Sequence, residues 1–205
     1  MLNLTFFTGG IAQTNGWVLT TPAGALVFDA PEGMADWLDE KQVRVSALLL
    51  THQHFDHVLD AAAIQKRHQC PVYSFAEHSK SLTLETFLGT MTGMGWAVEP
   101  YRVDHLLEGQ DSLRVCEIEW QLFHVPGHSP DSVCFYSAAH GLLFGGDVLF
   151  AGSIGRSDFP GGSMKQLVQG IAEKLLPLPD ATRVFPGHGP ETTIGDERDS
   201  NPYLE

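Results

Sequence analysis

Hydrophobic and polar residues follow two different spacings along the chain, and the spacing changes from segment to segment. Short runs rich in β-branched and aromatic residues, separated by Gly, Asn and Pro, predict β-strands. Apolar residues repeated every three or four positions predict helices. The predicted strands span residues 2–8, 16–20, 25–29, 45–51, 117–125, 132–137, 142–145 and 182–185. The predicted helices span residues 33–43, 57–68, 82–96 and 163–176.

Two of these segments give clear signals. Residues 45–51 are almost wholly apolar, as expected of a strand that is covered on both faces. Residues 163–166 form a capping-box pattern at the start of the last helix. Leu167, Ile171 and Leu175 then share one apolar face of that helix, which indicates packing against a sheet.

The predicted helix at residues 82–96 is the least regular, because three glycines interrupt it. Its large apolar residues stand at helical spacing, as in any buried helix. We therefore expect these four residues to pack in the core: Phe87, Met91, Met94 and Trp96.

Composition is that of a globular protein. The chain has 205 residues, of which 43% are hydrophobic and 18% are charged. No apolar run reaches the ~18 residues of a membrane span, and residues 1–7 do not resemble a signal peptide. No linker or low-complexity segment divides the chain, so we expect one α/β domain over residues 1–205 and a cytoplasmic location.

Charge and cysteine content exclude several classes of protein. With 25 acidic and 12 basic residues, the formal net charge is −13, which repels phosphate backbones and anionic membranes. We therefore expect no nucleic-acid partner and no membrane partner, while the oligomeric state stays open. Cys70, Cys116 and Cys134 form no C-x-x-C pair, so we expect reduced thiols rather than a cysteine zinc site or a disulfide.

The strongest chemical signal is the segment T-H-Q-H-F-D-H at residues 51–57, directly after an apolar strand. Because extended backbone alternates sides, His52 and His54 point the same way. A turn then brings Asp56 and His57 to the same place at the start of a helix. Imidazole and carboxylate groups are the ligands that zinc and similar metals take in catalytic sites.

Three further candidates, His128, Asp147 and His188, each stand just past a predicted strand. Two of them end near-identical segments, V-P-G-H at residues 125–128 and F-P-G-H at residues 185–188. Proline cannot donate to a sheet and glycine can take a positive φ, so each segment delivers its histidine beyond a strand end. Ligand sites of α/β sheets gather at such ends. Five histidines and two aspartates suit two metals that share a carboxylate.

Each of these later residues also has a simpler interpretation when it is taken alone. Asp147 could be a turn aspartate, and His188 could be a surface residue. Together the simpler interpretations require several coincidences. The remaining histidines lack such a context, and we expect them to be structural or surface residues: His68, His78, His105, His124 and His140.

The H-x-H-x-D-H segment followed by His128, Asp147 and His188 resembles the metallo-β-lactamase superfamily over nearly the whole chain. Residues 151–158 (A-G-S-I-G-R-S-D) and 187–195 (G-H-G-P-E-T-T-I-G) are similar to glyoxalase II, the hydroxyacylglutathione hydrolases, in the short form without a helical C-terminal domain. The resemblance implies the metallo-β-lactamase fold, a four-layer αβ/βα sandwich with its site at one edge of two sheets.

The same resemblance implies a ligand set for two divalent metal ions, with zinc favoured over iron or manganese. The first metal would be held by His52, His54 and His128, the second by Asp56, His57 and His188, and Asp147 would bridge them. Asp56 is also the candidate catalytic residue, because its carboxylate could orient the attacking hydroxide.

The implied reaction is hydrolysis of a small-molecule thioester by a metal-bridging hydroxide, with S-lactoylglutathione and related hydroxyacylglutathiones favoured.

One alternative is an iron-dependent persulfide dioxygenase, an oxidoreductase of the same fold that shares the segment at residues 155–159. A lactonase is another. β-Lactamase activity is less favoured, because Asp147 stands where many such enzymes have a cysteine ligand. A metal-binding module without catalysis is disfavoured, because all seven ligand positions are present.

Recognition of the thiol is the least defined property. Long glyoxalase II forms hold glutathione with a C-terminal domain, whereas this chain stops at Glu205, so we expect weaker or broader thiol selectivity than in the long forms. Arg156, Lys165 and Arg198 are candidate anion partners by residue type only. Arg156 is followed closely by Asp158, and we expect these two to form a buried ion pair instead.

Overall fold

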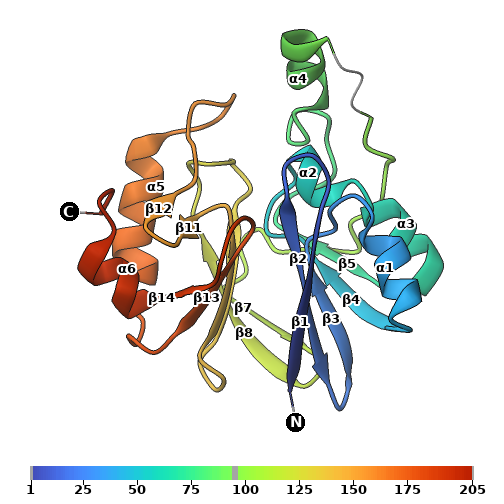
Figure 1. Cartoon of the computed structure of the whole chain (residues 1–205), viewed down its shortest axis with the longest axis horizontal. Helices are drawn as coiled ribbons and strands as arrows, with labels where there is room; N and C mark the ends of the chain where they lie inside the picture. Colours follow the sequence, from blue (N-terminus) through green and yellow to red (C-terminus); the bar gives the residue numbers. More distant parts are fainter. Residues whose placement is uncertain (1, 94–96, 205) are drawn as a thin grey trace. The chain divides into compact units, whose positions relative to one another are not determined.

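The computed structural model describes residues 2–93 and 97–204, and its chain divides into two compact units, residues 1–108 and 109–205 (Figure 1). Each unit has its own sheet with helices packed on it and its own cluster of buried apolar residues. The one-domain organisation over residues 1–205 stays a prediction. Among the described residues, none of the helices is long and apolar enough to cross a membrane.

The first unit is built on a mixed sheet. Its strands lie in the order of the chain and are β1 (Asn3–Gly9), β2 (Thr14–Thr21), β3 (Gly24–Phe28), β4 (Val45–Leu49), β5 (Val72–Ser74) and β6 (His105–Leu106). The first three pair antiparallel, and β3 to β6 pair parallel. Its helices are α1 (Met34–Glu40), α2 (Phe55–Val58), α3 (Ala61–His68) and α4 (Glu85–Thr92).

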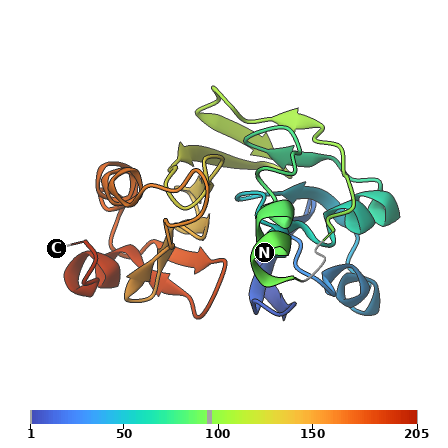
Figure 2. The ribbon, with the colours of Figure 1, turned by 90° about the horizontal axis from the view of Figure 1, so that it is seen from above.

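Helices α1 and α3 cover one face of this sheet (Figures 1 and 2). Met34 and Leu38 of α1 and Ile64 of α3 are fully buried against Val27 and Leu48 of the central strands. Strand β4 is buried along almost its whole length, as its apolar sequence predicts. Its carboxyl end therefore leads directly into the segment that carries the first candidate ligands.

The second unit is built on a sheet in which antiparallel pairs dominate. Its strands are β14 (Thr192–Thr193), β13 (Arg183–Pro186), β10 (Leu142–Gly146), β9 (Val133–Ser137), β8 (Ile118–His124) and β7 (Ser112–Val115), in that spatial order. Strands β10 and β13 pair parallel. A small hairpin of β11 (Leu149–Phe150) and β12 (Ser153–Ile154) follows β10.

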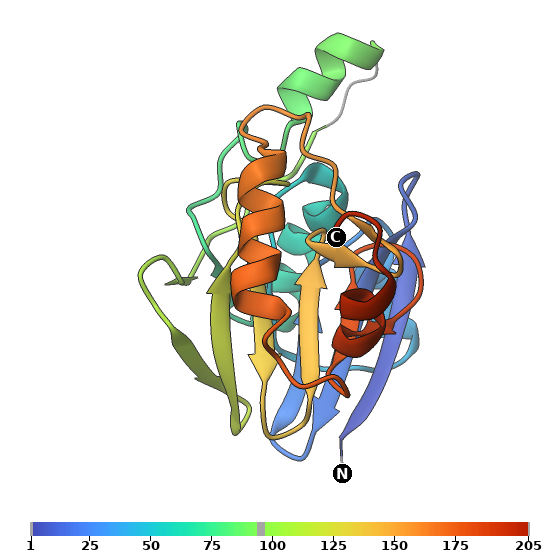
Figure 3. The same ribbon diagram turned by 90° about the vertical axis from the view of Figure 1, so that its left-hand side faces the viewer.

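Helix α5 (Met164–Gly170) continues into the π-helical turn η1 (Ile171–Leu175), and α6 (Ile194–Ser200) ends the unit (Figure 3). Ser163 caps α5, because its Oγ accepts a hydrogen bond from the amide of Gln166 at 3.4 Å. Leu167, Ile171 and Leu175 are fully buried, which confirms the apolar face predicted for this helix.

Every strand predicted from the sequence is present, with its ends within two residues of the observed bounds. The helix predicted at residues 57–68 is in fact two helices, α2 and α3, which a break at Leu59 and Asp60 separates. The helix predicted at residues 82–96 is shorter, since α4 spans Glu85–Thr92 and is ended by Gly93, whose φ of 69° is left-handed.

Helix α4 projects from the first unit (Figure 1), and Met91 is 70% exposed, so the expectation of core packing is wrong for Met91. Met94 and Trp96 lie outside the described residues. Strands such as β5, β6 and β14 were not predicted, because two or three residues are too few to show a periodic pattern.

Candidate metal centre

The first cluster of candidate ligands lies in the segment that follows β4. This segment has no regular structure until α2 begins at Phe55. The ring centroids of His52 and His54 lie 4.6 Å apart, and those of His52 and His57 lie 4.1 Å apart. A donor atom of His52 lies within 4.8 Å of one from each of the other two histidines. The prediction that these imidazoles gather in one place is confirmed within the first unit.

Asp56 belongs to the same cluster. Its Oδ2 atom lies 3.5 Å from Nε2 of His57 and accepts a hydrogen bond of 2.7 Å from the hydroxyl of Thr14. Thr14 is fully buried at the start of β2. The hydroxyl therefore fixes the orientation of the Asp56 carboxylate from a neighbouring strand.

Asp29, which follows β3 directly, is a buried residue that the sequence analysis did not assign to the site. Its Oδ1 accepts the amide of Thr51 at 2.7 Å, and its Oδ2 accepts the hydroxyl of Thr51 at 2.7 Å. Nδ1 of His57 lies 2.9 Å from the same Oδ2. A carboxylate can only accept, so Nδ1 of His57 carries the proton and Nε2 keeps its lone pair for a metal.

The same reasoning reaches His52. The Thr51 hydroxyl donates its proton to Asp29, so it can only accept from Nδ1 of His52 at 3.2 Å. Nε2 of His52 is then the unprotonated nitrogen. Asp29 thus sets the tautomer of two candidate ligands, one directly and one through Thr51. A hint was present in the sequence, because Asp29 is the last residue of the strand predicted at residues 25–29, and Asp147 closely follows the strand predicted at residues 142–145.

The second cluster lies in the second unit, at the ends of β8, β10 and β13. Oδ2 of Asp147 lies 3.4 Å from Nε2 of His128 and 3.3 Å from Nε2 of His188. Nδ1 of His128 donates to the carbonyl oxygen of Arg156 at 2.8 Å, which directs Nε2 of His128 toward Asp147. The three later candidates are therefore brought together, as predicted from their positions after strands.

Gly155 lies against both His128 and Asp147. A Cβ atom at this position would be 2.0 Å from the backbone oxygen of Asp147 and 3.1 Å from Cβ of His128. Backbone cannot yield as a flexible side chain can, so any larger residue must displace these two ligands. The segment at residues 155–158, which the sequence analysis singled out, therefore packs directly on the second cluster.

We expect Gly155→Ala to weaken Zn²⁺ binding about tenfold or more and to lower the stability by about 1–3 kcal/mol. Isothermal titration with Zn²⁺ and thermal melting of the metal-free protein measure the two effects. Gly145→Ala is the matched control, because a Cβ there has no atom within 4 Å. Equal zinc affinities for the two variants would contradict the packing argument.

Both clusters consist of imidazole nitrogens and carboxylate oxygens, a donor set that zinc, iron and manganese all accept. No cysteine takes part in the candidate metal groups among the described residues. The residues present therefore fit divalent metal ions.

Among the described residues, the other histidines take no part in these metal-holding groups. Burial lowers the pKa of His68 and of His78, so both favour the neutral form. His140 lies exposed in a turn after β9, and Nε2 of His124 lies 2.8 Å from the carbonyl oxygen of Pro130. Their assignment as structural or surface residues agrees with these positions.

The cysteines are free thiols, as predicted. Burial raises the pKa of Cys70 to about 11 and that of Cys134 to about 12, so both stay protonated near neutral pH.

Two of the three basic candidates for anion binding are engaged in ion pairs. Arg156 and Asp158 form the predicted ion pair, with an Nε to Oδ1 distance of 2.7 Å, but both side chains are exposed rather than buried. The hydrogen bonds from Arg156 lower the pKa of Asp158 to about 2. Arg198 donates to the carbonyl of Leu178 and pairs with Asp180. Lys165 is exposed on α5.

An α/β chain with histidine and aspartate clusters at strand ends has the features of a metal-dependent enzyme. The chain belongs to the metallo-β-lactamase superfamily, whose family model matches residues 9–188. This confirms the predicted fold class. Proteins of this superfamily hold a binuclear metal centre, and membership indicates a metal-dependent hydrolase.

Similar proteins include a probable metallo-hydrolase and a hydroxyacylglutathione hydrolase. The chain is 38% identical to the probable metallo-hydrolase YqgX of Bacillus subtilis, over 95% of this chain and 94% of that protein. It is 34% identical to the hydroxyacylglutathione hydrolase GloC of Haemophilus influenzae, over 84% of this chain and 82% of that protein.

Solved structures of similar proteins include one described as a metallo-β-lactamase and one in a di-iron-bound form. The BLEG-1 B3 metallo-β-lactamase is 39% identical, with a TM-score of 0.86 over 98% of this chain and 99% of that one. TTHA1623 in a di-iron-bound form is 36% identical, with a TM-score of 0.82 over 98% and 100%. ETHE1 from Myxococcus xanthus is 23% identical, with a TM-score of 0.78 over 98% and 83%, a likeness in fold alone.

Proposed function

We propose that this protein is a binuclear metal-dependent hydrolase that cleaves thioesters, with hydroxyacylglutathiones such as S-lactoylglutathione as the favoured substrates. The observation that carries the proposal is the complete donor set of the two clusters. The 34% identity to the hydroxyacylglutathione hydrolase GloC supports the substrate class.

We propose further that the two clusters act together on two divalent metal ions. The first ion would be held by His52, His54 and His128, the second by Asp56, His57 and His188, with Asp147 between them. Zinc is the favoured metal, and the di-iron form of TTHA1623 makes iron the alternative to test first.

Divalent metals in such a centre supply a water of lowered pKa and polarise a carbonyl oxygen. Residues next to the proposed ligands fix the protonation of the ligand imidazoles. Asp29 and the carbonyl oxygen of Arg156 hold the protons of His57 and His128 on Nδ1, so that Nε2 is available. Because a thiolate is already a good leaving group, a thioester needs no protein acid to protonate it.

Asp56 is proposed to orient the attacking water as well as to bind metal. Its carboxylate is fixed by Thr14 and lies beside His57, so it is well placed to accept a hydrogen bond from the water and to fix the direction of that water. We expect Asp56→Asn to lower kcat for thioester hydrolysis about a hundredfold. Steady-state kinetics at saturating metal measures the effect, with the exposed Asp36→Asn as control. Full activity of metal-loaded Asp56→Asn would remove this second role.

The substrate class is tested by comparing reactions on one metal-replete preparation. We expect hydrolysis of S-D-lactoylglutathione to exceed that of a simple lactone and of a cephalosporin. Broad acceptance of other thiol esters is expected as well, because Arg156 and Arg198 pair with Asp158 and Asp180 rather than remaining free cations. Oxygen uptake with glutathione persulfide, without thioester hydrolysis, would replace the proposal by the dioxygenase alternative.

β-Lactam hydrolysis is a second candidate, because BLEG-1 is described as a B3 metallo-β-lactamase and is 39% identical. Both reactions need attack on an activated carbonyl, so the donor set serves either. A cephalosporin turned over faster than every thioester would decide for this second candidate.

We propose a cytoplasmic protein that acts on a small molecule rather than on nucleic acid or a membrane. The net charge of −13 supports this, because it disfavours polyanionic partners.

A further inference from the structure

Gln53 lies between His52 and His54 in the segment after β4, and its side chain is fully buried. Residues i and i+2 of an extended segment point the same way, so the residue between them points the opposite way. The two imidazoles therefore share one side of the segment, and the Gln53 amide occupies the other.

Hydrogen bonds saturate this amide. Its Nε2 donates to the carbonyl oxygens of Ala76 at 2.9 Å and Glu77 at 3.2 Å, and it lies 3.3 Å from the hydroxyl of Ser74. Its Oε1 accepts the hydroxyl of Tyr101 at 3.0 Å. A single side chain thus ties the ligand segment to the end of β5, to the loop after β5 and to the stretch before β6.

The backbone around Gln53 is held in place by hydrogen bonds to other segments of the first unit. Strand β4 ends at Leu49, and the segment at residues 50–54 belongs to neither a helix nor a strand. Asp29 holds it at Thr51, and the amide of Phe55 donates to the carbonyl oxygen of Thr83 at 3.0 Å. Between these two points, the side chain of Gln53 anchors the segment through its own hydrogen bonds.

We infer that Gln53 is a positioning residue for the metal centre, which fixes the spacing of His52 and His54 by anchoring their segment from the side opposite to the metal. The inference rests on the proposed metal centre and is independent of the substrate. Loss of the anchor widens the range of positions of the two imidazoles, and metal affinity falls because both must be ordered on binding.

The test is the affinity for Zn²⁺, measured by competition with a chromophoric chelator. Gln53→Met keeps the length and burial of the side chain but removes every hydrogen bond of the amide. We expect it to weaken zinc binding about tenfold or more, while circular dichroism shows a folded protein. Tyr101→Phe removes one bond of the four and is expected to have a smaller effect in the same direction.

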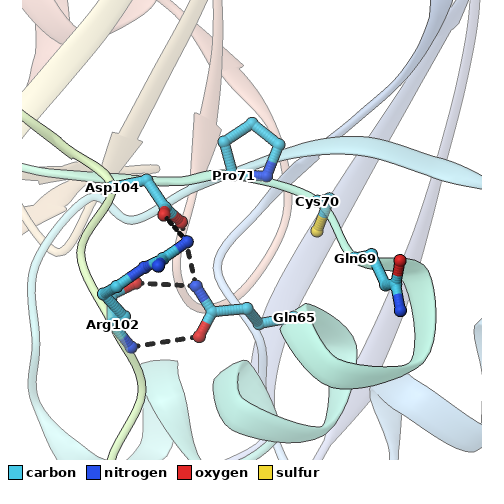
Figure 4. A pocket seen from close by; sticks show the side chains of 6 residues that line it. All are labelled: Gln65, Gln69, Cys70, Pro71, Arg102 and Asp104. Atoms are coloured by element: carbon cyan, nitrogen blue, oxygen red, sulfur yellow. Dashed lines mark hydrogen bonds and ion pairs between the residues drawn. The ribbon is translucent and has the colours of Figure 1, made fainter.

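Gln65 offers a matched control (Figure 4). It also bridges backbone groups, since its Nε2 donates to the carbonyl oxygen of Arg102 at 2.7 Å and its Oε1 accepts the amide of Arg102 at 3.0 Å. It lines a cavity of about 330 Å³ with Cys70 and Asp104, and no candidate ligand lines that cavity. Gln65→Met is expected to change stability but to leave the zinc affinity within about twofold of the wild type.

Zinc affinities of Gln53→Met and Tyr101→Phe within about twofold of the wild type would overturn the inference. An equal loss in Gln65→Met would also overturn it, because the effect would then reflect stability alone. Weakened zinc binding in Gln53→Met, in a protein that hydrolyses no thioester, would support the inference and refute the proposed substrate class. A wild-type protein without affinity for zinc would refute both the inference about Gln53 and the proposed metal centre.

Discussion

Replacing His54 with alanine is expected to lower thioester turnover about a thousandfold or more, equivalent to about 4 kcal/mol of lost transition-state stabilisation. His54 presents its imidazole beside that of His52, with ring centroids 4.6 Å apart, and both are proposed ligands of the first metal. Its loss leaves that metal with too few ligands to hold it. The chemistry that the metals supply, a water of lowered pKa, is then lost.

Hydrolysis of S-D-lactoylglutathione, followed at saturating Zn²⁺, measures this effect. His140→Ala is the control, because His140 is exposed in a turn and stands apart from both clusters. We expect the control to retain wild-type turnover. If His54→Ala and His140→Ala were equally active, the first cluster would have no part in catalysis.

Replacing Asp29 with asparagine is expected to produce the second-largest loss. The asparagine side chain can keep one oxygen for the amide of Thr51 and tolerates the left-handed φ of 62° at this position. Its nitrogen then faces His57 Nδ1, where a donor meets a donor. His57 must shift its proton to Nε2, the atom proposed to bind metal, or lose its partner.

We expect Asp29→Asn to weaken metal binding about 10–100-fold, the usual range for partners that orient metal ligands. Metal affinity and kcat should fall together, whereas the melting temperature of the metal-free protein should fall little. Asp60→Asn is the matched control, because Asp60 also accepts a backbone amide, that of Ala35 at 2.8 Å, but contacts no candidate ligand. Retained zinc affinity in Asp29→Asn would show that the tautomer of His57 is not set by this carboxylate.

The candidate ligands could be predicted from the sequence because their signals are local. His52, His54, Asp56 and His57 fall within six consecutive residues, and strand periodicity alone places two of them on one side. His128 was predictable because a Pro-Gly pair ends the strand before it. Strands of five or more residues were found for the same reason, since their alternation is long enough to recognise.

The residues that support the ligands could not be predicted in this way. Asp29 lies twenty-eight positions from His57 in the sequence, and only the pairing of β3 with β4 brings the ends of these strands together. Gln53 looks like an arbitrary residue within the motif until its partners at Ala76 and Tyr101 are known. Such contacts depend on the fold of distant segments, which hydrophobic spacing does not encode.

Helix α4 shows that an apolar pattern in the sequence does not by itself predict burial. The apolar spacing that indicates a buried face in α5 and η1 also occurs in α4, yet Met91 of α4 is 70% exposed. Spacing identifies the side of a helix that is apolar. Whether another element covers that side depends on where the helix lies in the fold.

The central claim is that the proposed ligands hold two metal ions, and metal content per chain tests it most directly. Elemental analysis should find two zinc ions per wild-type chain, as expected of two metals that share a carboxylate. His54→Ala in the first unit and His128→Ala in the second should each retain one ion, because both residues are proposed ligands of the same metal. Two ions retained in His128→Ala, with one lost in His54→Ala, would contradict the proposal that His54 and His128 hold the same metal.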